Sequence, residues 1–439
     1  MSTDTYAKIA ATMDAYKPAS VAQTLEWEKK YVARNSSTIE AVVSKAQGVH
    51  IWDTEGKHYL DFGSAFAAVS QGHCHPDIVR VLHEQAQTVS LSSRAFVPEK
   101  MVSFAKYITE TFGYDRVLPM NAGAEAVETA IKMARKWGYL KKKIPENQAI
   151  VLSAAGCYHG ITTGTMSVTS NDVLRTNFGP YLPNVGPIDP VTKKYIRYNN
   201  TDDLEEALKN NGPNVCAFLV EPIQGEAGVI IPDTGYLKRC AELCKEHNVL
   251  FICDEVQTGI GRTGTMLYHY QENIRPDIVT LGKALGGGVF PVSAVLADEH
   301  IMDVWGPDEN DSTWGGNPLG SAVAMAALEV VKHEKLAERA AVLGKRFREG
   351  LSKIQSPVVK EIRGRGLLNA LEVNLTHGPR TAWDLCYLLM ERGLLAKPTH
   401  QTNIRLSPAL TITEQEIDEA VDIIAQAIAD FEKRPAPAQ

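Results

Sequence analysis

Residues 249–264 read VLFICDEVQTGIGRTG, an apolar run that ends in two carboxylates and leads into three glycines. The β-branched and aromatic residues at its start predict a strand buried on both faces, as in a parallel sheet. Amphipathic stretches separate it from similar short apolar runs at residues 115–120, 149–156, 216–222, 277–284 and 291–298. This alternation predicts an α/β fold built on a mainly parallel, wound sheet.

The pattern changes near residue 330. Residues 317–354 read as one long helix, strand-like residues follow at 358–373, and a closing helix is expected over 414–431. Thr413 and Glu416 have the spacing of a capping box at the start of that last helix. These features predict a second, smaller α+β domain.

The N-terminal segment is expected to complete that smaller domain. Residues 48–62 alternate like a hairpin, with a turn at Glu55-Gly56. We therefore expect residues 1–80 to contribute to the small domain, 81–330 to form the large domain and 331–439 to form the rest of the small domain. The final residues, RPAPAQ, are too polar and proline-rich to predict order.

Composition excludes several classes of partner. The net charge of −7 comes without a strongly basic block, so neither a nucleic acid nor an anionic membrane is expected. No apolar run reaches the ~18 residues of a membrane span. The first residues contain Asp4 and Asp14, are poor in arginine and lack an apolar signal core. With seven scattered cysteines, these features predict a cytoplasmic protein in a reducing environment.

Two motifs suggest chemistry that the surrounding residues do not favour. Gly259, Gly261 and Gly264 match the spacing of a dinucleotide-binding turn, but the residues after them do not read as an amphipathic helix. Cys240 and Cys244 lie one helical turn apart, yet no second pair is spaced to complete four zinc ligands. We therefore expect neither a nicotinamide or flavin cofactor nor a metal.

A stronger candidate combines two successive strand ends. Asp254 closes one predicted strand, and Lys283 follows the next one. The carboxyl ends of parallel strands face one crevice, where desolvation lowers the pKa of a lysine toward a reactive, Schiff-base-forming amine. An aspartate beside it suits the protonated ring nitrogen of pyridoxal phosphate. The small residues Gly123 and Ala124 open an amphipathic helix whose N-terminus can hold the phosphate, with Thr313 as a second contributor.

Longer segments resemble a known family. The chain is similar to class III (fold type I) pyridoxal-phosphate aminotransferases over residues 120–139, 220–229, 250–264, 281–288, 312–320 and 364–371. Within that class, residues 71–79, 93–96, 275–285, 291–298 and 393–400 are most similar to ornithine aminotransferases. The resemblance extends from about residue 25 to 430. It implies a homodimer with shared active sites that moves a terminal amino group from an ornithine-like donor to 2-oxoglutarate.

The resemblance also implies roles for individual residues. Lys283 would form the Schiff base and carry the proton, Asp254 would pair with the pyridine nitrogen, and Gln257 would lie near the phenolic oxygen. Tyr158 would stack on the ring, with His159 beside it. The backbone of Gly123 and Ala124 would bind the phosphate, which Thr313 would reach from the neighbouring subunit.

A second implied set would handle the substrates. Arg405 would bind the α-carboxylate of 2-oxoglutarate, and Glu226 would neutralise that arginine when an ω-amine enters. The alternative interpretation of this pair is an ordinary salt bridge, which the surrounding motifs make less favoured.

Three positions depart from the ornithine aminotransferase pattern. Ile161 stands where that family has the arginine that binds the donor α-carboxylate, while Ser36 and Phe66 replace two pocket tyrosines. These changes predict a more apolar donor pocket unless Arg34 or His159 compensates. A less polar ω-amine, a 4-aminobutyrate-type donor and a decarboxylase on the same fold therefore stay open as alternatives.

Overall fold

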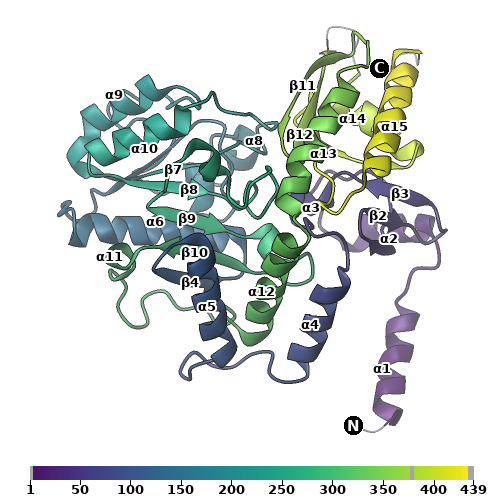
Figure 1. Cartoon of the computed structure of the whole chain (residues 1–439), viewed down its shortest axis with the longest axis horizontal. Helices are drawn as coiled ribbons and strands as arrows, with labels where there is room; N and C mark the ends of the chain where they lie inside the picture. Colours follow the sequence, from purple (N-terminus) through teal and green to yellow (C-terminus); the bar gives the residue numbers. More distant parts are fainter. Residues whose placement is uncertain (1–2, 376–379, 434–439) are drawn as a thin grey trace.

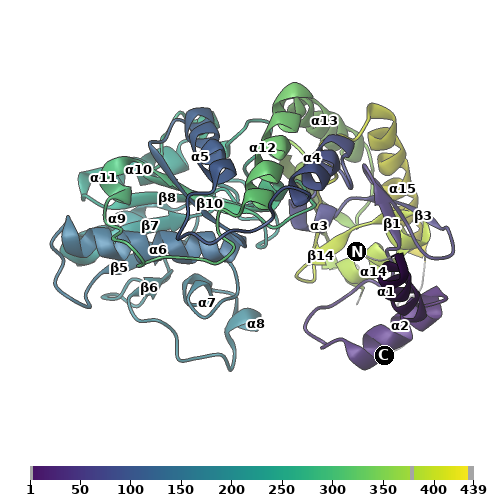
Figure 2. The same cartoon turned by 90° about the horizontal axis from the view of Figure 1, so that it is seen from below.

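The structure is a computed structural model that describes residues 3–375 and 380–433. Figures 1 and 2 show a broad body built around one large sheet, beside a smaller body formed by both ends of the chain. The expected disorder of RPAPAQ concerns residues 434–439, which lie outside the described residues.

A seven-stranded sheet forms the centre of the larger body, in the order β4-β10-β9-β8-β7-β5-β6. Neighbouring strands are parallel except where β10 pairs antiparallel with β4 and β9. The expected mainly parallel α/β fold is confirmed, and each of the six apolar runs supplies a strand. The strands are β4 (Arg116–Met120), β5 (Ile150–Ser153), β6 (Val185–Gly186), β7 (Val215–Val220), β8 (Leu250–Asp254), β9 (Ile278–Leu281) and β10 (Ser293–Ala297).

Helices cover both faces of this sheet because each buries one apolar stripe. Helix α6 (Gly123–Leu140) packs on β7, β9 and β10, and α10 (Tyr236–Glu246) packs on β8 (Figure 2). The other elements of the larger body are α4 (Pro76–Ala86), α5 (Glu99–Phe112), α7 (Thr165–Val168), α8 (Asp172–Arg175), α9 (Thr201–Asn211), η1 (Gly212–Asn214), η2 (Tyr268–Glu272), η3 (Lys283–Gly286), α11 (Glu299–Met302) and α12 (Pro318–His333).

Two four-stranded sheets form the smaller body, in the orders β1-β2-β3-β13 and β11-β12-β15-β14. Their strands are β1 (Lys45–Gln47), β2 (His50–Trp52), β3 (His58–Asp61), β11 (Val359–Arg365), β12 (Leu368–Val373), β13 (Leu394–Leu395), β14 (Lys397–Thr399) and β15 (Asn403–Leu406). The helices are α2 (Val21–Tyr31), α3 (Ser64–Ala67), α13 (Leu336–Leu351), α14 (Ala382–Glu391) and α15 (Glu414–Lys433).

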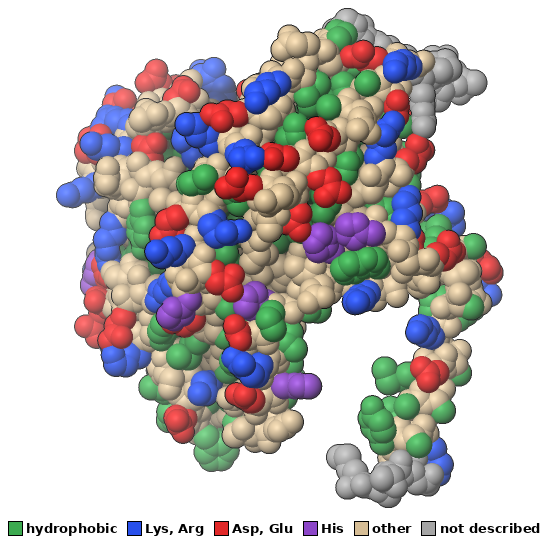
Figure 3. Space-filling model, turned by 45° about the vertical axis from the view of Figure 1, so that its right-hand side comes forward, with side chains coloured by type: hydrophobic (Ala, Val, Ile, Leu, Met, Phe, Trp, Pro, Cys, Tyr) green, Lys and Arg blue, Asp and Glu red, His purple; other side chains and the backbone are tan. Residues whose placement is uncertain are grey.

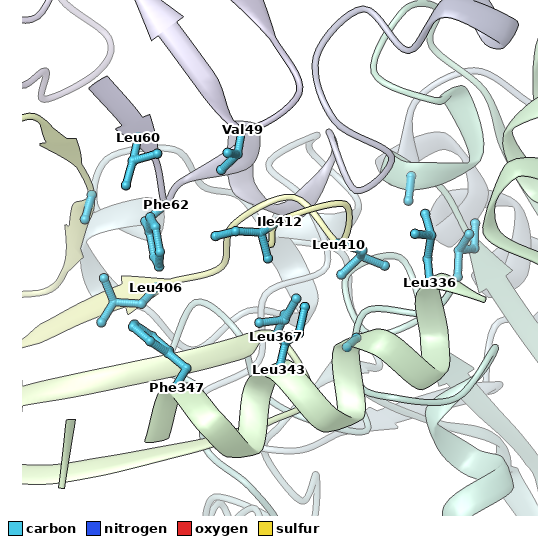
Figure 4. Close-up of a cluster of buried hydrophobic side chains, with 14 of the residues drawn as sticks. Val49, Leu60, Phe62, Leu336, Leu343, Phe347, Leu367, Leu406, Leu410 and Ile412 are labelled. Atoms are coloured by element: carbon cyan, nitrogen blue, oxygen red, sulfur yellow. The ribbon is translucent and has the colours of Figure 1, made fainter. Parts of the chain in front are cut away.

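The two ends of the chain share one core. The predicted hairpin forms between β2 and β3, and β3 also pairs in parallel with β13 from the C-terminal region. Figure 4 shows side chains from both ends packed together, namely Val49, Leu60, Phe62, Leu336, Leu343, Phe347, Leu367, Leu406, Leu410 and Ile412. The domain boundaries near residues 80 and 330 stay a prediction.

The long helix expected over residues 317–354 is wrong in one respect. It divides into α12 and α13, and Lys335 between them has a left-handed backbone with a φ of 51°. The break lets α12 pack on α4 and α5 while α13 packs on β11 and α15. The predicted capping box is present, because the Thr413 N–H donates to Glu416 at 2.7 Å and the Glu416 N–H donates to Thr413 Oγ1 at 3.2 Å.

The glycine turn after β8 serves packing. A Cβ atom on Gly264, whose φ is 100°, would approach the Ala341 Cβ of α13 to 3.1 Å. Close approach between the turn and this helix therefore explains the spacing that resembles a dinucleotide-binding motif. None of the helices in the described residues is long and apolar enough to cross a membrane.

Candidate active site

Two cavities meet at Tyr158, which lines both. The inner cavity, about 220 Å³, lies at the carboxyl ends of β8 and β9 and is lined by Gly123, Ala124, Val127, Tyr158, His159, Gly160, Ile161, Glu221, Asp254, Val256, Gln257 and Lys283. The outer cavity, about 770 Å³, is lined partly by the smaller body. Its lining includes Ser36, Phe66, Glu226, Lys397, His400 and Arg405.

Lys283 lies at the start of η3, directly after β9. Its φ of 43° is in the left-handed region, which a lysine adopts only when the surrounding structure holds it there. Desolvation lowers the pKa of Lys283 below its ordinary value, although the nearby Glu226 opposes this shift. A lowered pKa increases the share of uncharged amine at neutral pH, which makes this lysine a nucleophile.

Asp254 and His159 form a buried pair in the inner cavity. His159 Nδ1 lies 2.7 Å from Asp254 Oδ2, and the other carboxylate oxygen accepts from Thr280 Oγ1 at 2.9 Å. Burial alone disfavours both charges, but their mutual hydrogen bond raises the pKa of His159 well above its usual range and lowers that of Asp254. Asp254 is therefore held as a carboxylate.

A second carboxyl group, Glu221, follows β7 at the same sheet edge. Its two oxygens accept from the backbone N–H groups of Tyr158 and Gly225, at 2.7 and 3.1 Å. Burial raises the pKa of Glu221 to about 7, while the charge of His159 opposes that rise. These hydrogen bonds fix the loop that presents Tyr158 to both cavities.

The N-terminus of α6 forms one wall of the inner cavity. The first backbone N–H groups of a helix have no partner within it and carry a partial positive charge. Gly160 packs so closely here that a Cβ atom on it would approach the Ala124 Cβ to 2.7 Å. This glycine therefore keeps the wall at Gly123 and Ala124 open to an anion.

In the outer cavity, Arg405 on β15 forms an ion pair with Glu226. Gln257 Nε2 lies 3.4 Å from Glu226 Oε1 and so links this pair to the inner cavity. Burial works to raise the pKa of Glu226, but the charge of Arg405 lowers it overall. The Glu226 carboxylate is therefore favoured in its charged form.

Phe66 covers part of the outer cavity. It belongs to α3, where residues 64–67 all have positive φ values and Asp61 accepts hydrogen bonds from the N–H groups of Gly63 and Ser64. The Arg405 guanidinium lies 5.0 Å from the centre of the Phe66 ring. Four successive left-handed residues are strained, so the fold holds this aromatic ring against the arginine.

Comparison with known proteins places this geometry in a family. Residues 31–428 match the model of the class III aminotransferases. An ornithine aminotransferase of Schizosaccharomyces pombe is 56% identical over 92% of this chain and 92% of its own length. An ornithine aminotransferase of Emericella nidulans is 53% identical over 95% of this chain and 92% of its own length.

Solved structures of aminotransferases resemble this fold closely. The crystal structure of an ornithine aminotransferase from Toxoplasma gondii superposes with a TM-score of 0.92 at 43% identity and covers 96% of this chain and 98% of that one. An acetylornithine aminotransferase from Elizabethkingia anophelis has a TM-score of 0.84 at 48% identity, over 94% of this chain and all of that one. This chain belongs to the class III aminotransferases.

The inner cavity of this aminotransferase fits pyridoxal phosphate. His159 Nε2 and Gln257 Oε1 are buried without a hydrogen-bond partner among residues 3–375 and 380–433, as expected where a polar ligand would complete the site. The helix terminus at Gly123 suits a phosphate, and the Asp254 carboxylate suits a protonated ring nitrogen. A structure of the Toxoplasma gondii enzyme is described with the same cofactor at its active site.

Most of the predicted cofactor residues come together in this aminotransferase. Gly123, Ala124, Tyr158, His159, Asp254, Gln257 and Lys283 all line the inner cavity. Thr313 is exposed and lines neither cavity. The functional roles of all these residues, including Thr313, stay predictions.

The predicted substrate residues divide between the cavities. Ser36, Phe66, Glu226 and Arg405 line the outer cavity, whereas Ile161 lines the inner one with 61% of its surface exposed. Neither suggested compensating cation lines the outer cavity. Arg34 lies outside both cavities, and His159 is engaged by Asp254.

The sequence patterns missed three features of the aminotransferase site. The hydrogen bond between His159 and Asp254 joins residues far apart in the chain, and the backbone contacts of Glu221 depend on a folded loop. Glu221 ends an apolar run, as Asp254 does, so its place at a strand end was a usable signal. Lys397 also lies in the outer cavity. Its segment, residues 393–400, is similar to ornithine aminotransferases, but that resemblance implied no role for the lysine.

Proposed function

We propose that this chain is a pyridoxal-phosphate-dependent aminotransferase that moves the terminal amino group of ornithine to 2-oxoglutarate, giving an aldehyde and glutamate. The observation that carries the proposal is the pair of joined cavities. Lys283 and Asp254 line the inner one, and the Glu226–Arg405 ion pair lies in the outer one. The relatives named ornithine aminotransferases, at more than half identity, support the donor.

Pyridoxal phosphate, when bound, supplies an electron sink for the substrate carbon that loses a proton. Lys283 would attach the cofactor and move that proton, because its lowered pKa increases the share of neutral amine. Asp254 would orient the cofactor ring, and Tyr158 would cover it and exclude water. The N-terminus of α6 binds the phosphate.

The outer cavity accounts for the use of two unlike substrates. With Glu226 paired to it, Arg405 offers no free charge to an incoming ω-amine. When a dicarboxylate enters, Arg405 exchanges Glu226 for the substrate carboxylate, which it can bind with two hydrogen bonds. The relatives named above give no support to the decarboxylase and 4-aminobutyrate alternatives.

The working unit is proposed to be a homodimer with shared sites. Thr313 is exposed outside both cavities, which suits the contact with a neighbouring subunit's cofactor phosphate that the resemblance implies. Helix α1 (Thr3–Ala15) also projects from the body, and Figure 3 shows hydrophobic side chains on it. Tyr6 and Met13 of this helix are 75% and 70% exposed, which suits a helix that packs on another subunit.

The proposed location is the cytoplasm. It rests on the composition of the chain as a whole, whose scattered cysteines are all free in the structure. The ornithine aminotransferases of Oryza sativa and Arabidopsis thaliana are named as mitochondrial, so fractionation of cells that express the natural gene tests this point.

A donor screen tests the reaction. The holoenzyme is given 2-oxoglutarate with ornithine, N-acetylornithine, 4-aminobutyrate or 1,4-diaminobutane, and glutamate is measured. Ornithine is expected to have the highest kcat/KM. A clear preference for any other donor would contradict the assignment of ornithine, and carbon dioxide release without glutamate would contradict the reaction class.

A further inference from the structure

Lys397 is a cation of the outer cavity to which the proposed reaction assigns no role. It begins β14, and its ammonium group lies 5.3 Å from the centre of the Phe66 ring. Desolvation lowers the pKa of Lys397, whereas the charge of Glu226 opposes the shift. The ammonium group is therefore partly desolvated beside the Phe66 ring.

The strand register places Lys397 opposite another cation. In the antiparallel pair of β14 and β15, Lys397 is the direct partner of Arg405. Like charges at such positions destabilise a sheet, because their side chains lie on the same face within reach of each other. A placement that costs stability and faces a cavity is typical of a functional group.

The charges around the outer cavity do not cancel. Arg405 is already paired with Glu226, the one carboxylate among the residues that line this cavity. Within the described part of the chain, no carboxylate lies within ion-pair distance of the Lys397 ammonium group. The cavity therefore has one positive charge in excess, and an anionic group on a ligand would neutralise it.

We propose that Lys397 binds the carboxylate of the amino donor and so selects an amino acid over a simple amine. This inference rests on the proposed function. The donor's carboxylate would lie in the outer cavity against Lys397, its methylene groups would pass Phe66, and its terminal amine would point past Tyr158 toward Lys283 in the inner cavity. Ile161 supplies no charge for this purpose, so Lys397 is the specificity-determining cation.

The test compares donors that differ only in the carboxylate. Steady-state constants of the holoenzyme are measured for ornithine and for 1,4-diaminobutane, with 2-oxoglutarate as acceptor, in the wild type and in Lys397→Met, Lys397→Arg and Lys345→Met. Lys397→Met keeps the length of the side chain without its charge. Lys345→Met is the matched control, because Lys345 lies on the surface of α13 with its side chain 75% exposed.

Lys397→Met is expected to raise the KM for ornithine roughly tenfold to a hundredfold, the range for losing a hydrogen bond to a charged group. The KM for 1,4-diaminobutane should stay within about twofold, and Lys397→Arg should recover most of the ornithine affinity. An equal change in the KM for both donors, or no change in the KM for ornithine, would overturn the role of Lys397. Turnover of ornithine by the wild type would still uphold the proposed function in that case.

A wild type that leaves ornithine unreacted would instead contradict the proposed donor. The same comparison is then made with 5-aminopentanoate and 1-aminobutane, which share a terminal amine and differ in the carboxylate. A selective loss of 5-aminopentanoate affinity in Lys397→Met supports the carboxylate site. Equal affinities in the wild type and the variant, or no reaction of the wild type with 5-aminopentanoate, overturn that site.

Discussion

The inner and outer cavities differ in how they are built. The inner cavity lies at the carboxyl ends of parallel strands in one sheet, and its residues match what pyridoxal phosphate requires. The outer cavity gathers residues from β14, β15, α3 and the N-terminal segment, and Ser36 and Phe66 depart there from the pattern of ornithine aminotransferases. The residues predicted to carry the chemistry thus line the inner cavity, whereas the predicted substrate residues other than Ile161 line the outer one.

That separation means that donor choice can change without rebuilding the reaction centre. A hydrogen bond between Gln257 and Glu226 links a side chain of the inner cavity to one of the outer cavity. Substitutions in the inner cavity should therefore lower kcat with every substrate, whereas those in the outer cavity should change KM for particular substrates.

The largest effect is expected for Lys283→Ala. Without the amine there is no group to attach the cofactor or move the proton, so kcat should fall by at least about a thousandfold with every donor. Glutamate formation measures the loss. Lys345→Ala, on the exposed surface of α13, is the matched control. Activity within tenfold of the wild type would show that the inner cavity is not the reaction centre.

A smaller effect is expected for His159→Gln. The imidazolium group lowers the pKa of Asp254, so its removal should raise that pKa and cut kcat by about tenfold to a hundredfold. The acid limb of the pH–kcat profile should move to higher pH, a change that a purely structural role would not cause.

His333→Gln is the matched control for this variant, since the His333 side chain is 79% exposed. An unchanged acid limb in His159→Gln would mean that Asp254 does not depend on this histidine for its charge.

Glu226→Gln tests the outer cavity. Releasing Arg405 from its partner should lower the KM for 2-oxoglutarate by up to about tenfold and raise that for ornithine, with little change in kcat. Initial rates at varied acceptor concentration measure this, and Glu242→Gln, on the solvent-facing side of α10 with its side chain 49% exposed, is the control. Parallel changes in both KM values would contradict the exchange of partners by Arg405.

The smallest expected effect concerns stability in the cofactor-free protein. The pKa of Glu221 is raised from 4.5 to about 7, so between these values the folded protein holds a proton that the unfolded chain releases. The free energy of unfolding should therefore fall as pH rises through this window. The Glu221 carboxyl group contributes at most ~1.4 kcal/mol per pH unit to that fall. Glu221→Gln should remove that slope in urea unfolding measured across the window. Equal slopes in the wild type and the variant would contradict a raised pKa.

Much of the fold was predictable because its signals are local. Apolar runs such as residues 249–254 become buried strands wherever they pair, and Gly123 begins an amphipathic helix. Lys335 shows the limit of this reasoning. The helical pattern continues through it, but packing on two different bodies requires a break there.

The sequence by itself determined the parallel sheet, the strand-end pair of Asp254 and Lys283, and the family to which the chain belongs. These features follow from hydrophobic periodicity and from short segments whose residues lie close together in the chain. Only the tertiary structure decided that His159 binds Asp254, that Ile161 lines the inner cavity, and that Lys397 faces Arg405. Such contacts depend on strand order and register, which join residues distant in sequence.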